Sequence, residues 1–340
     1  MGTGRVGRQG LTSGESDAAQ ALRECEGTNS LDRTVEVWSG GVNTWECDEM
    51  GHLNVRFWVA KAIESLAGLT RLMGMPDAFA RSGGATLVIH DLHMRFLREA
   101  RAGACLWASG GVVALGETDA DLLLVLRHAD GTPAATFRLR AEHATASDLR
   151  PFPWPQRIRT ACAALMTEVP DFAAPRSINL SPVTESRANL AFAERTGMTR
   201  IGLGTVRADE LDVFGRMRPE MFIGRVSDGV ARLFGPTRPG PDAAPGDPPQ
   251  RIGGAVLEYR VVHHGWPLAG EHVEVRSGFA DCNARTRRVF HWMVDPVSGK
   301  PWASAEAVVI SFDLDARKVV DISEAAQAEF RSRAIPGLGL

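Results

Sequence analysis

The sequence predicts an α+β fold in which an antiparallel sheet wraps around one long central helix, and it predicts two copies of that unit. Two observations lead to this prediction. The segment 45–69, WECDEMGHLNVRFWVAKAIESLAGL, can be laid over 209–233, DELDVFGRMRPEMFIGRVSDGVARL, without a gap. Runs of strand-forming residues, separated by Gly and Asp, then follow each segment in the same order, as is typical of hairpins.

The two copies keep a constant offset of 164 residues through the turn and the helix. The matched positions are Asp48 and Asp212, Gly51 and Gly215, Trp58 and Phe222, Val59 and Ile223, Leu66 and Val230, and Leu69 and Leu233. Further along, Gly103 lies near Gly270, and Gly131 matches Gly299. A chance match would not keep one order of elements over more than a hundred residues, so we interpret the chain as an internal duplication.

Each copy predicts the same series of elements. A short strand comes first, at 34–42 and 200–208, and an acidic turn follows it. A helix of about five turns then begins near residues 51 and 215. The strand-like runs after the helix are 85–98, 104–116 and 120–145 with a turn at Asp130-Gly131, and 252–263, 271–282 and 286–313 with a turn at Ser298-Gly299.

These elements divide the chain. We expect a polar, Gly-rich tail at 1–32, a first domain at 33–146, a linker at 147–199 with a helix near 156–168, a second domain at 200–322 and a C-terminal tail at 323–340. The stretch 235–250 is rich in Pro and Gly and predicts an exposed loop.

The first central helix is apolar on two sides. The wide stripe consists of Val55, Trp58, Val59, Ala62, Leu66, Leu69 and Met73, and a narrower one of Leu53, Phe57, Ala60 and Ala67. A helix of this kind is expected to be buried nearly all round. Glu64 falls inside the narrower stripe, where an unpaired carboxylate would be costly, and Asp228 repeats an acid there in the second copy.

Composition excludes several classes of function. A net charge of −3 over 340 residues argues against a general binder of nucleic acids or anionic membranes. No apolar run reaches the ~18 residues that a membrane span needs, and the first thirty residues lack the apolar stretch of a signal peptide. The five cysteines are scattered and never spaced CxxC, which predicts neither disulfides nor zinc and suits a reducing cytoplasm.

The turn before the first helix reads Asp48, Gly51, His52 and Asn54, and Glu64 follows sixteen positions after the Asp. Together with the helix, the strand order and the duplication, this motif resembles the hotdog-fold thioesterases, in particular the hydroxybenzoyl-CoA thioesterase-like branch and the tandem acyl-ACP thioesterases. The resemblance covers roughly 33–146 and 200–320. It implies a double hotdog fold and hydrolysis of acyl-CoA or acyl-ACP in fatty acid metabolism.

The resemblance also implies what the chain binds. CoA or phosphopantetheine would enter as part of the substrate, with no separate cofactor and no metal. Single-domain relatives dimerise and place their sites at the interface, so the tandem chain looks like such a dimer on one polypeptide. Two double-hotdog chains could in turn form a homodimer.

The resemblance implies that Asp48 is the catalytic carboxylate, as a nucleophile or as a base that activates water. The first amides of the helix, near Gly51 to Val55, would polarise the thioester carbonyl. His52 and Asn54 would orient water or the carbonyl. The alternative for Asp48 is a plain N-cap, and for His52 and Asn54 hydrogen bonds of the turn.

Glu64 is open to two interpretations, a supporting acid of the site or a structural hydrogen-bond partner. If the central helices lie antiparallel, as in the family's dimers, Glu64 would approach the turn at Asp212. Asp228 would then approach Asp48 and contribute to substrate binding.

The second copy departs from the motif, because Arg216 and Arg218 replace the His and the Asn. We therefore expect one working site and one degenerate site. Arg216, Arg218 and Arg225 could bind the phosphates of CoA or the acidic surface of a carrier protein, or they could be a solvated helix start.

Other residues and functions stay open. Cys47 could act as a nucleophile, although the second copy has Leu211 there. His90 and His93 lie on the first strand after the helix and are either close to substrate or ordinary strand residues. The alternative functions are a hotdog that senses acyl thioesters without cleaving them, and a hotdog hydratase or dehydratase, whose Asp–His loop is not found here.

Overall fold

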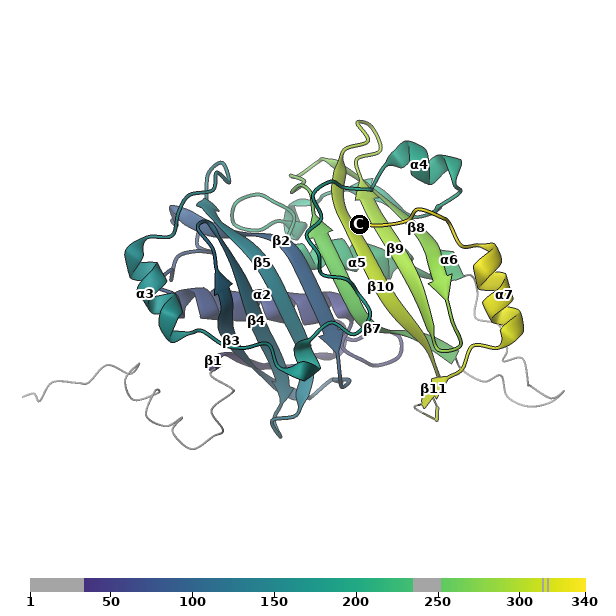
Figure 1. Ribbon diagram of the computed structural model, residues 1–340, viewed down its shortest axis with the longest axis horizontal. Helices are drawn as coiled ribbons and strands as arrows, with labels where there is room; N and C mark the ends of the chain where they lie inside the picture. Colours follow the sequence, from purple (N-terminus) through teal and green to yellow (C-terminus); the bar gives the residue numbers. More distant parts are fainter. Residues whose placement is uncertain (1–33, 235–251, 314, 317) are drawn as a thin grey trace, which may run out of the picture.

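Two copies of one unit lie side by side and share a single antiparallel sheet (Figure 1). The structure is a computed structural model, and it describes residues 34–234, 252–313, 315–316 and 318–340. The tail expected at 1–32 and the loop expected at 235–250 lie outside the described residues. None of the described helices is long and apolar enough to cross a membrane.

The first copy follows the predicted order of elements. They are β1 (Val35–Gly41), the 3₁₀ helix η1 (Thr44–Glu46), α2 (Val55–Leu72), β2 (Ala85–Phe96), β3 (Cys105–Leu115), β4 (Asp119–His128) and β5 (Pro133–Thr145). The positive φ of Gly131, 81°, makes the tight turn between β4 and β5 where the sequence predicts it.

The second copy repeats this order with a shorter central helix. Its elements are β6 (Thr199–Thr205), the 3₁₀ helix η3 (Ala208–Glu210), α5 (Pro219–Gly229), α6 (Ala231–Phe234), β7 (Ile252–His263), β8 (His272–Cys282), β9 (Thr286–Val294), β10 (Pro301–Asp313) and β11 (Lys318–Val320). Between the copies lie α3 (Gln156–Ala164), η2 (Asp171–Ala173) and α4 (Leu190–Arg195).

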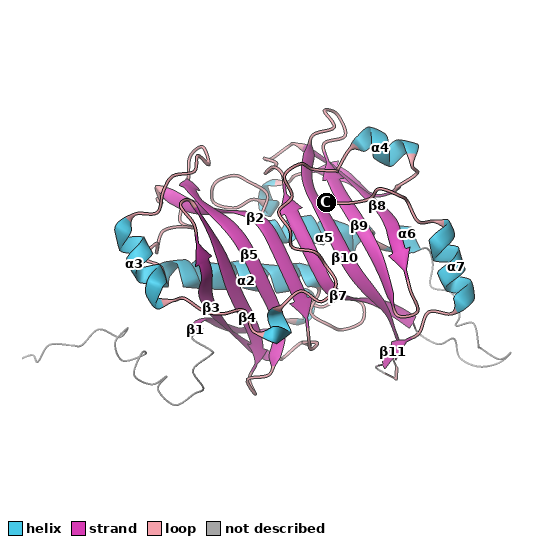
Figure 2. Ribbon diagram, in the orientation of Figure 1, coloured by secondary structure: helices cyan, strands magenta, loops and turns pink. Residues whose placement is uncertain are grey.

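The strands run in the order β1-β3-β4-β5-β2-β7-β10-β9-β8-β6, with β11 beside β10. β2 and β7 pair antiparallel at the junction, with His93 directly opposite Arg260, so the two units join edge to edge. Both central helices lie against one face of this sheet, as Figure 2 shows, and the apolar core fills the space between. This is the tandem hotdog that the sequence predicts.

The central helices approach the outermost strands very closely. A Cβ on Gly68 would lie 2.0 Å from the carbonyl oxygen of Val37, and a Cβ on Gly229 would lie 2.1 Å from that of Ile201. Real Cβ atoms do not come this close, so each helix needs its glycine where it crosses the first strand of its unit. In both copies the close contact fixes the helix on the sheet.

Two predictions about the central helices are wrong. The helices begin at Val55 and Pro219 rather than near 51 and 215, because the residues after each Asp form a separate turn with Gly51 and Gly215 at positive φ. The second error concerns Glu64, which the narrower apolar stripe places among buried residues, although in this helix only Glu64 and Arg71 are exposed. The sheet covers one side, and Glu64 is exposed on the other.

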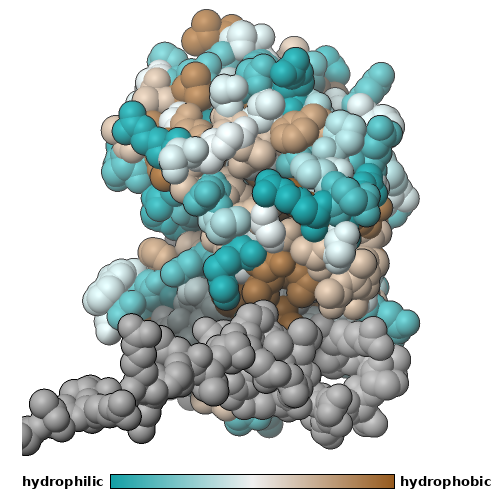
Figure 3. Space-filling view, turned by 90° about the vertical axis from the view of Figure 1, so that its left-hand side faces the viewer, coloured by the Kyte–Doolittle hydropathy of each residue, from teal (hydrophilic) through white to brown (hydrophobic). Residues whose placement is uncertain are grey.

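The linker and the C-terminus cover the opposite face of the sheet (Figure 1). Ala173 packs on Leu123 and Val125 of β4, and the linker runs over the junction between the copies. The segment expected as a C-terminal tail contains α7 (Glu324–Ser332), whose Phe330 ring meets the Phe279 ring edge to face, with 5.1 Å between the ring centroids. Figure 3 shows the first copy from its end, where hydrophobic side chains form small groups among polar ones.

A buried ion pair ties the helix to the turn before it in each copy. Lys61 Nζ lies 2.8 Å from Glu46 Oε1 and donates to the carbonyl of Gly41 at 2.9 Å. In the second copy, Arg225 lies 2.6 Å from Glu210 Oε2 and donates to the carbonyl of Thr205 at 2.8 Å. All three partners keep the offset of 164, so this brace is part of the duplicated design.

We expect Lys61→Met to lower the free energy of unfolding by about 3–5 kcal/mol, because it leaves the Glu46 carboxylate buried without a cation. Lys61→Arg copies the second unit and should stay close to the wild type. Chemical denaturation of the two variants checks this. Equal stability of Lys61→Met and Lys61→Arg would show that the pair contributes nothing.

Candidate active site

The Asp48 carboxylate lies in a tight turn, half-buried. Its Oδ1 accepts the amides of Met50 at 2.9 Å and His52 at 3.1 Å. The amide of Gly51 donates to the carbonyl of Asp48, and the φ of +76° at Gly51 lets the chain close this turn. Oδ2 has no hydrogen-bond partner among the residues that the structure describes, so one oxygen is held and the other is available.

Burial raises the pKa of the Asp48 carboxyl above its usual 3.8, and the two amides and the nearby His52 oppose this shift. A raised pKa makes a carboxylate a better proton acceptor than one in water. Asp48 does not cap the helix. That role belongs to Asn54, whose Oδ1 accepts the amide of Arg56 at 2.9 Å.

The first amide of α2 is unpaired. Arg56 donates to the Asn54 side chain, and the amides of Phe57 and Trp58 both donate to the Asn54 carbonyl. The amide of Val55 has no acceptor among the described residues. The structure thus presents one free N–H at the positive end of a five-turn helix, seven positions after the carboxylate.

His52 borders the same turn. Its side chain is largely buried, and Nε2 lies 3.3 Å from Glu99 Oε2, in the segment between β2 and β3. Glu99 is a residue that the sequence analysis missed, because nothing in the chain around it marks it as a partner of the motif. Cys47, the alternative nucleophile, has its thiol donating to the carbonyl of Asn43 at 3.5 Å.

The second copy forms the same turn, but a side chain of the turn pairs with its carboxylate. Asp212 Oδ1 accepts the amides of Phe214 at 2.9 Å and Arg216 at 3.0 Å. Oδ2, the oxygen without a partner in the first copy, binds the Arg216 guanidinium at 2.9 and 3.0 Å. Arg216 is buried, and its charge also lies over the ring of Phe214. It is therefore a partner of Asp212 and not an exposed phosphate contact.

The second copy also lacks an amide at the position of Val55. Its central helix begins with Pro219, which occupies the position of Val55 and has no N–H. The sequence analysis missed this difference, although the offset of 164 places Pro219 on Val55. Arg218, in place of Asn54, makes no cap bond and lies 3.3 Å from Glu220.

The central helices contact each other beside the Asp48 turn. The side chain of Arg56 crosses α5 at Gly224, where an added Cβ would lie 3.0 Å from Arg56 Cδ. Glu220 is buried in this contact, and its burial raises the pKa of its carboxyl, an effect that Arg218 and Arg56 reduce. The second copy thus supplies the surface against which the start of α2 packs.

Several predicted residues lie elsewhere. Glu64 and Asp228 are both exposed, and neither makes a hydrogen bond or ion pair with another described residue. Their approach to the Asp212 and Asp48 turns stays a prediction. His90 pairs with Glu142 at 3.0 Å, and His93 is buried at the junction of the copies, 2.8 Å from Glu258.

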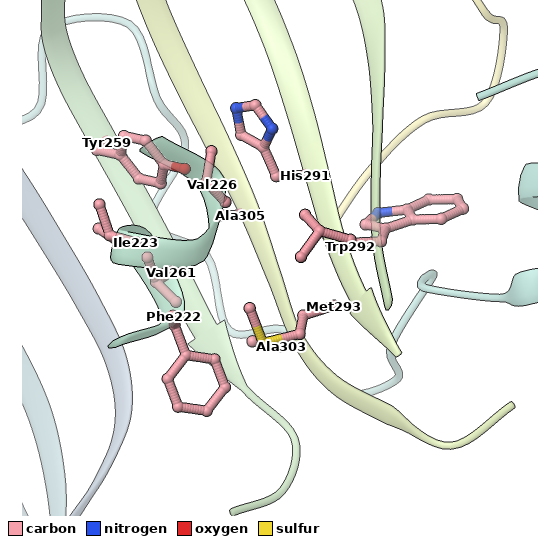
Figure 4. Close-up of a pocket in the computed structure, with 11 residues that line it drawn as sticks. Phe222, Ile223, Val226, Tyr259, Val261, His291, Trp292, Met293, Ala303 and Ala305 are labelled. Carbon is pink, nitrogen blue, oxygen red and sulfur yellow. The ribbon is translucent and has the colours of Figure 1, made fainter. Parts of the chain in front are cut away.

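The core of the second copy holds a polar group that the first lacks. Tyr259, Ser277 and His291 occupy the positions of Leu92, Gly110 and Leu124 in the first copy. Ser277 Oγ lies 2.7 Å from His291 Nδ1, and burial lowers the pKa of His291 to about 3. Figure 4 shows the Tyr259 hydroxyl and His291 lining one small cavity beside α5, of about 10 Å³, which is room for one water-sized group.

Among the described residues, no cluster of His, Cys, Asp and Glu could hold a metal ion.

Solved structures share this architecture. A putative oleoyl thioesterase from Lactobacillus plantarum aligns with a TM-score of 0.60 at 13% identity, over 81% of this chain and 96% of that one. The 12:0-ACP thioesterase from Umbellularia californica aligns with 0.59 at 11%, over 82% and 94%. An acyl-ACP thioesterase from Bacteroides thetaiotaomicron aligns with 0.57 at 8%, over 82% and 98%. At these identities the likeness shows the fold.

No curated protein matches the sequence significantly. A family description does match, and it matches twice, once in each copy, over residues 42–162 and 206–330. These two ranges contain the Asp48 and the Asp212 turn, and together they cover more than half of the chain. The chain belongs to the Thioesterase-like superfamily.

Proposed function

We propose that this protein hydrolyses acyl thioesters, and that a single site at the Asp48 turn does the chemistry. The observation that carries the proposal is the difference between the two turns. Asp48 has an available carboxylate oxygen and the free amide of Val55 nearby in the chain, whereas Asp212 is paired with Arg216 and followed by Pro219. Membership of the Thioesterase-like superfamily supports the reaction class.

In the proposed reaction the thioester carbonyl lies at the start of α2. Asp48 Oδ2 either takes a proton from the attacking water or attacks the carbonyl carbon itself, and both routes place negative charge on the carbonyl oxygen. The Val55 N–H, at the positive end of the helix, stabilises that charge. In the water route, collapse of the intermediate breaks the C–S bond and releases the free acid and a thiolate, which takes up the proton held by Asp48. In the nucleophilic route, the same collapse releases the thiolate and leaves a mixed anhydride on Asp48, which a water molecule then hydrolyses to the free acid and the Asp48 carboxylate.

The substrate is proposed to be an acyl group on CoA or on a carrier protein. The structural neighbours named above as acyl-ACP thioesterases support the second source, and Arg218, partly exposed near the second turn, could contact the phosphates of either. A panel of acyl-CoAs and acyl-ACPs with a thiol reagent separates the candidates. Release of thiol supports hydrolysis, and binding without release would support a sensor.

Asp48→Asn should lower turnover by about 10²–10⁴-fold, because an amide neither accepts the proton nor attacks the carbonyl. Asp212→Asn is the matched control in the second turn, and it should leave kcat close to the wild-type value. Steady-state kinetics on the best substrate of the panel gives both numbers. If Asp212→Asn abolishes turnover and Asp48→Asn spares it, the working site has been assigned to the wrong copy.

Val55→Pro should lower kcat by about 10²–10³-fold, the usual effect of removing one oxyanion donor. Proline is tolerated at the first position of a helix, and Asn54 already has the extended ψ of 144° that a following proline requires, so the fold should hold. Val55→Ala keeps the amide and serves as the control.

A melting temperature close to that of the wild type shows that Val55→Pro is folded. Full activity of this variant would exclude the Val55 amide as the oxyanion donor.

A further inference from the structure

The linker crosses the junction of the two copies on the face of the sheet opposite the central helices (Figure 1). Beneath it, β2 and β7 carry the sheet from one copy to the other through five residue pairs, from Asp91–Val262 to Arg95–Glu258. Apart from the single turn η2, residues 171–181 form no helix or strand. Backbone outside regular structure still has to satisfy its polar groups, so bonds to the two copies decide where this segment lies.

One arginine of β7 binds both the first copy and the linker. Arg260 Nε donates to Asp91 Oδ1 at 3.0 Å, across the junction. Its Nη1 donates to the carbonyl of Asn179 at 2.6 Å, and its Nη2 donates to that of Ser181 at 2.9 Å. The side chain of Arg260 is only 3% exposed. This guanidinium therefore joins three parts of the chain, which are the first copy, the second copy and the linker.

A buried acid two positions away makes a second joint of the same kind. Glu258 Oε1 lies 2.8 Å from Nε2 of His93 in the first copy. The same carboxylate accepts the linker amides of Arg176 at 2.8 Å and Ser177 at 2.9 Å, and it accepts the Ser177 hydroxyl at 2.9 Å. Burial alone would raise the pKa of the Glu258 carboxyl, but these bonds lower it to about 2. Glu258 is therefore charged at neutral pH, and hydrogen bonds to a charged group are stronger than neutral ones.

The first copy holds the linker directly as well. Arg95 of β2 donates from Nη1 to the carbonyls of Phe172 and Ala174, each at 2.9 Å. Ala173, between them, is fully buried against β4. The segment is thus held at its start by the first copy and from Arg176 onward by the second.

We propose that residues 171–181 act as a strap that holds the two copies together through these bonds, so that the chain stays one body even when it is cut beyond the strap. The chain that follows allows such a cut, because Thr184 and Glu185 are exposed and lie outside any helix or strand. A cut there leaves the strap on the piece with the first copy, and its contacts with Glu258 and Arg260 then link the two pieces without a covalent bond. The strap also keeps α5 in place against the start of α2.

Cleavage of the full chain tests the proposal. A site for a sequence-specific protease is inserted between Thr184 and Glu185. Dyes at the two ends of the chain report by energy transfer whether the pieces separate when the cut protein is diluted. The pieces of the cut wild type should stay associated at micromolar concentration.

Two serines of the strap give a matched pair of variants. Ser177→Ala removes the hydroxyl bond to Glu258, and it should raise the dissociation constant of the pieces about tenfold, as is usual for a bond to a charged group. Ser181→Ala removes a hydroxyl that donates within the linker, to Asn179 Oδ1 at 2.8 Å, and its pieces should dissociate as those of the wild type do. Arg260→Gln removes a whole joint and should raise the constant by about a hundredfold or more.

Separation of the wild-type pieces at micromolar concentration would overturn the proposal. Equal dissociation constants for Ser177→Ala and the wild type would overturn it as well, because other contacts between the copies would then hold the pieces together. Circular dichroism of the uncut chains shows that each variant is folded, and if Arg260→Gln is not, the two serine variants decide the outcome. Thioester hydrolysis is not measured, so this proposal and the proposed function can fail separately.

Discussion

The buried pair of Glu46 and Lys61 fixes where the helix meets the turn, and the rest of the site depends on that junction. Glu46 also accepts the amide of Asn43, and its carbonyl accepts the amide of Asn54. The chain on both sides of Asp48 is thereby held at two points. With its ends fixed, the turn needs only the positive φ of Gly51 to place the Asp48 carboxylate within reach of the backbone amides of the turn. The unpaired Val55 amide then follows at the helix start.

The duplication separates what the fold requires from what the proposed chemistry requires. The brace, the glycine of the turn and the glycine at the strand crossing recur in both copies, so they belong to the fold. Among the described residues, the first copy alone has a carboxylate oxygen of this turn without a partner and an N–H at the first helical position. In the second copy, Arg216 forms an ion pair with the carboxylate. Pro219 has no N–H, although proline is well tolerated at the first position of a helix. The second copy thus keeps the shape of the site and gives up the groups that would react.

Much of the fold could be predicted from the sequence, because the repeat, the strand order and the Gly-marked turns are local signals. The start of the helix could not. The apolar spacing extends back to Leu53, so it does not show where the helix begins. Only the hydrogen bonds of Asn54 mark the end of the turn and the start of the helix. Glu64 was misplaced for a similar reason, since apolar neighbours do not reveal which side of a helix the sheet leaves uncovered.

Within the candidate site, the sequence predicted that Asp48, Gly51, His52 and Asn54 lie together, because the motif is contiguous. Two other features could not be found by reading along the chain. Glu99 reaches His52 from a different segment, and the engagement of Asp212 by Arg216 depends on a side-chain conformation. The loss of the amide at Pro219 could have been predicted from the sequence. It requires comparing the two copies position by position and noting which chemical group each substitution removes.

The most direct test of a single working site is a crystal structure with a non-hydrolysable thioester analogue of the preferred substrate. The account predicts one analogue per chain, at the first turn, with its carbonyl oxygen about 3 Å from the Val55 amide nitrogen and its carbonyl carbon facing Asp48 Oδ2. An analogue bound at the Asp212 turn, or one at the first turn with its carbonyl directed away from Val55, would contradict it.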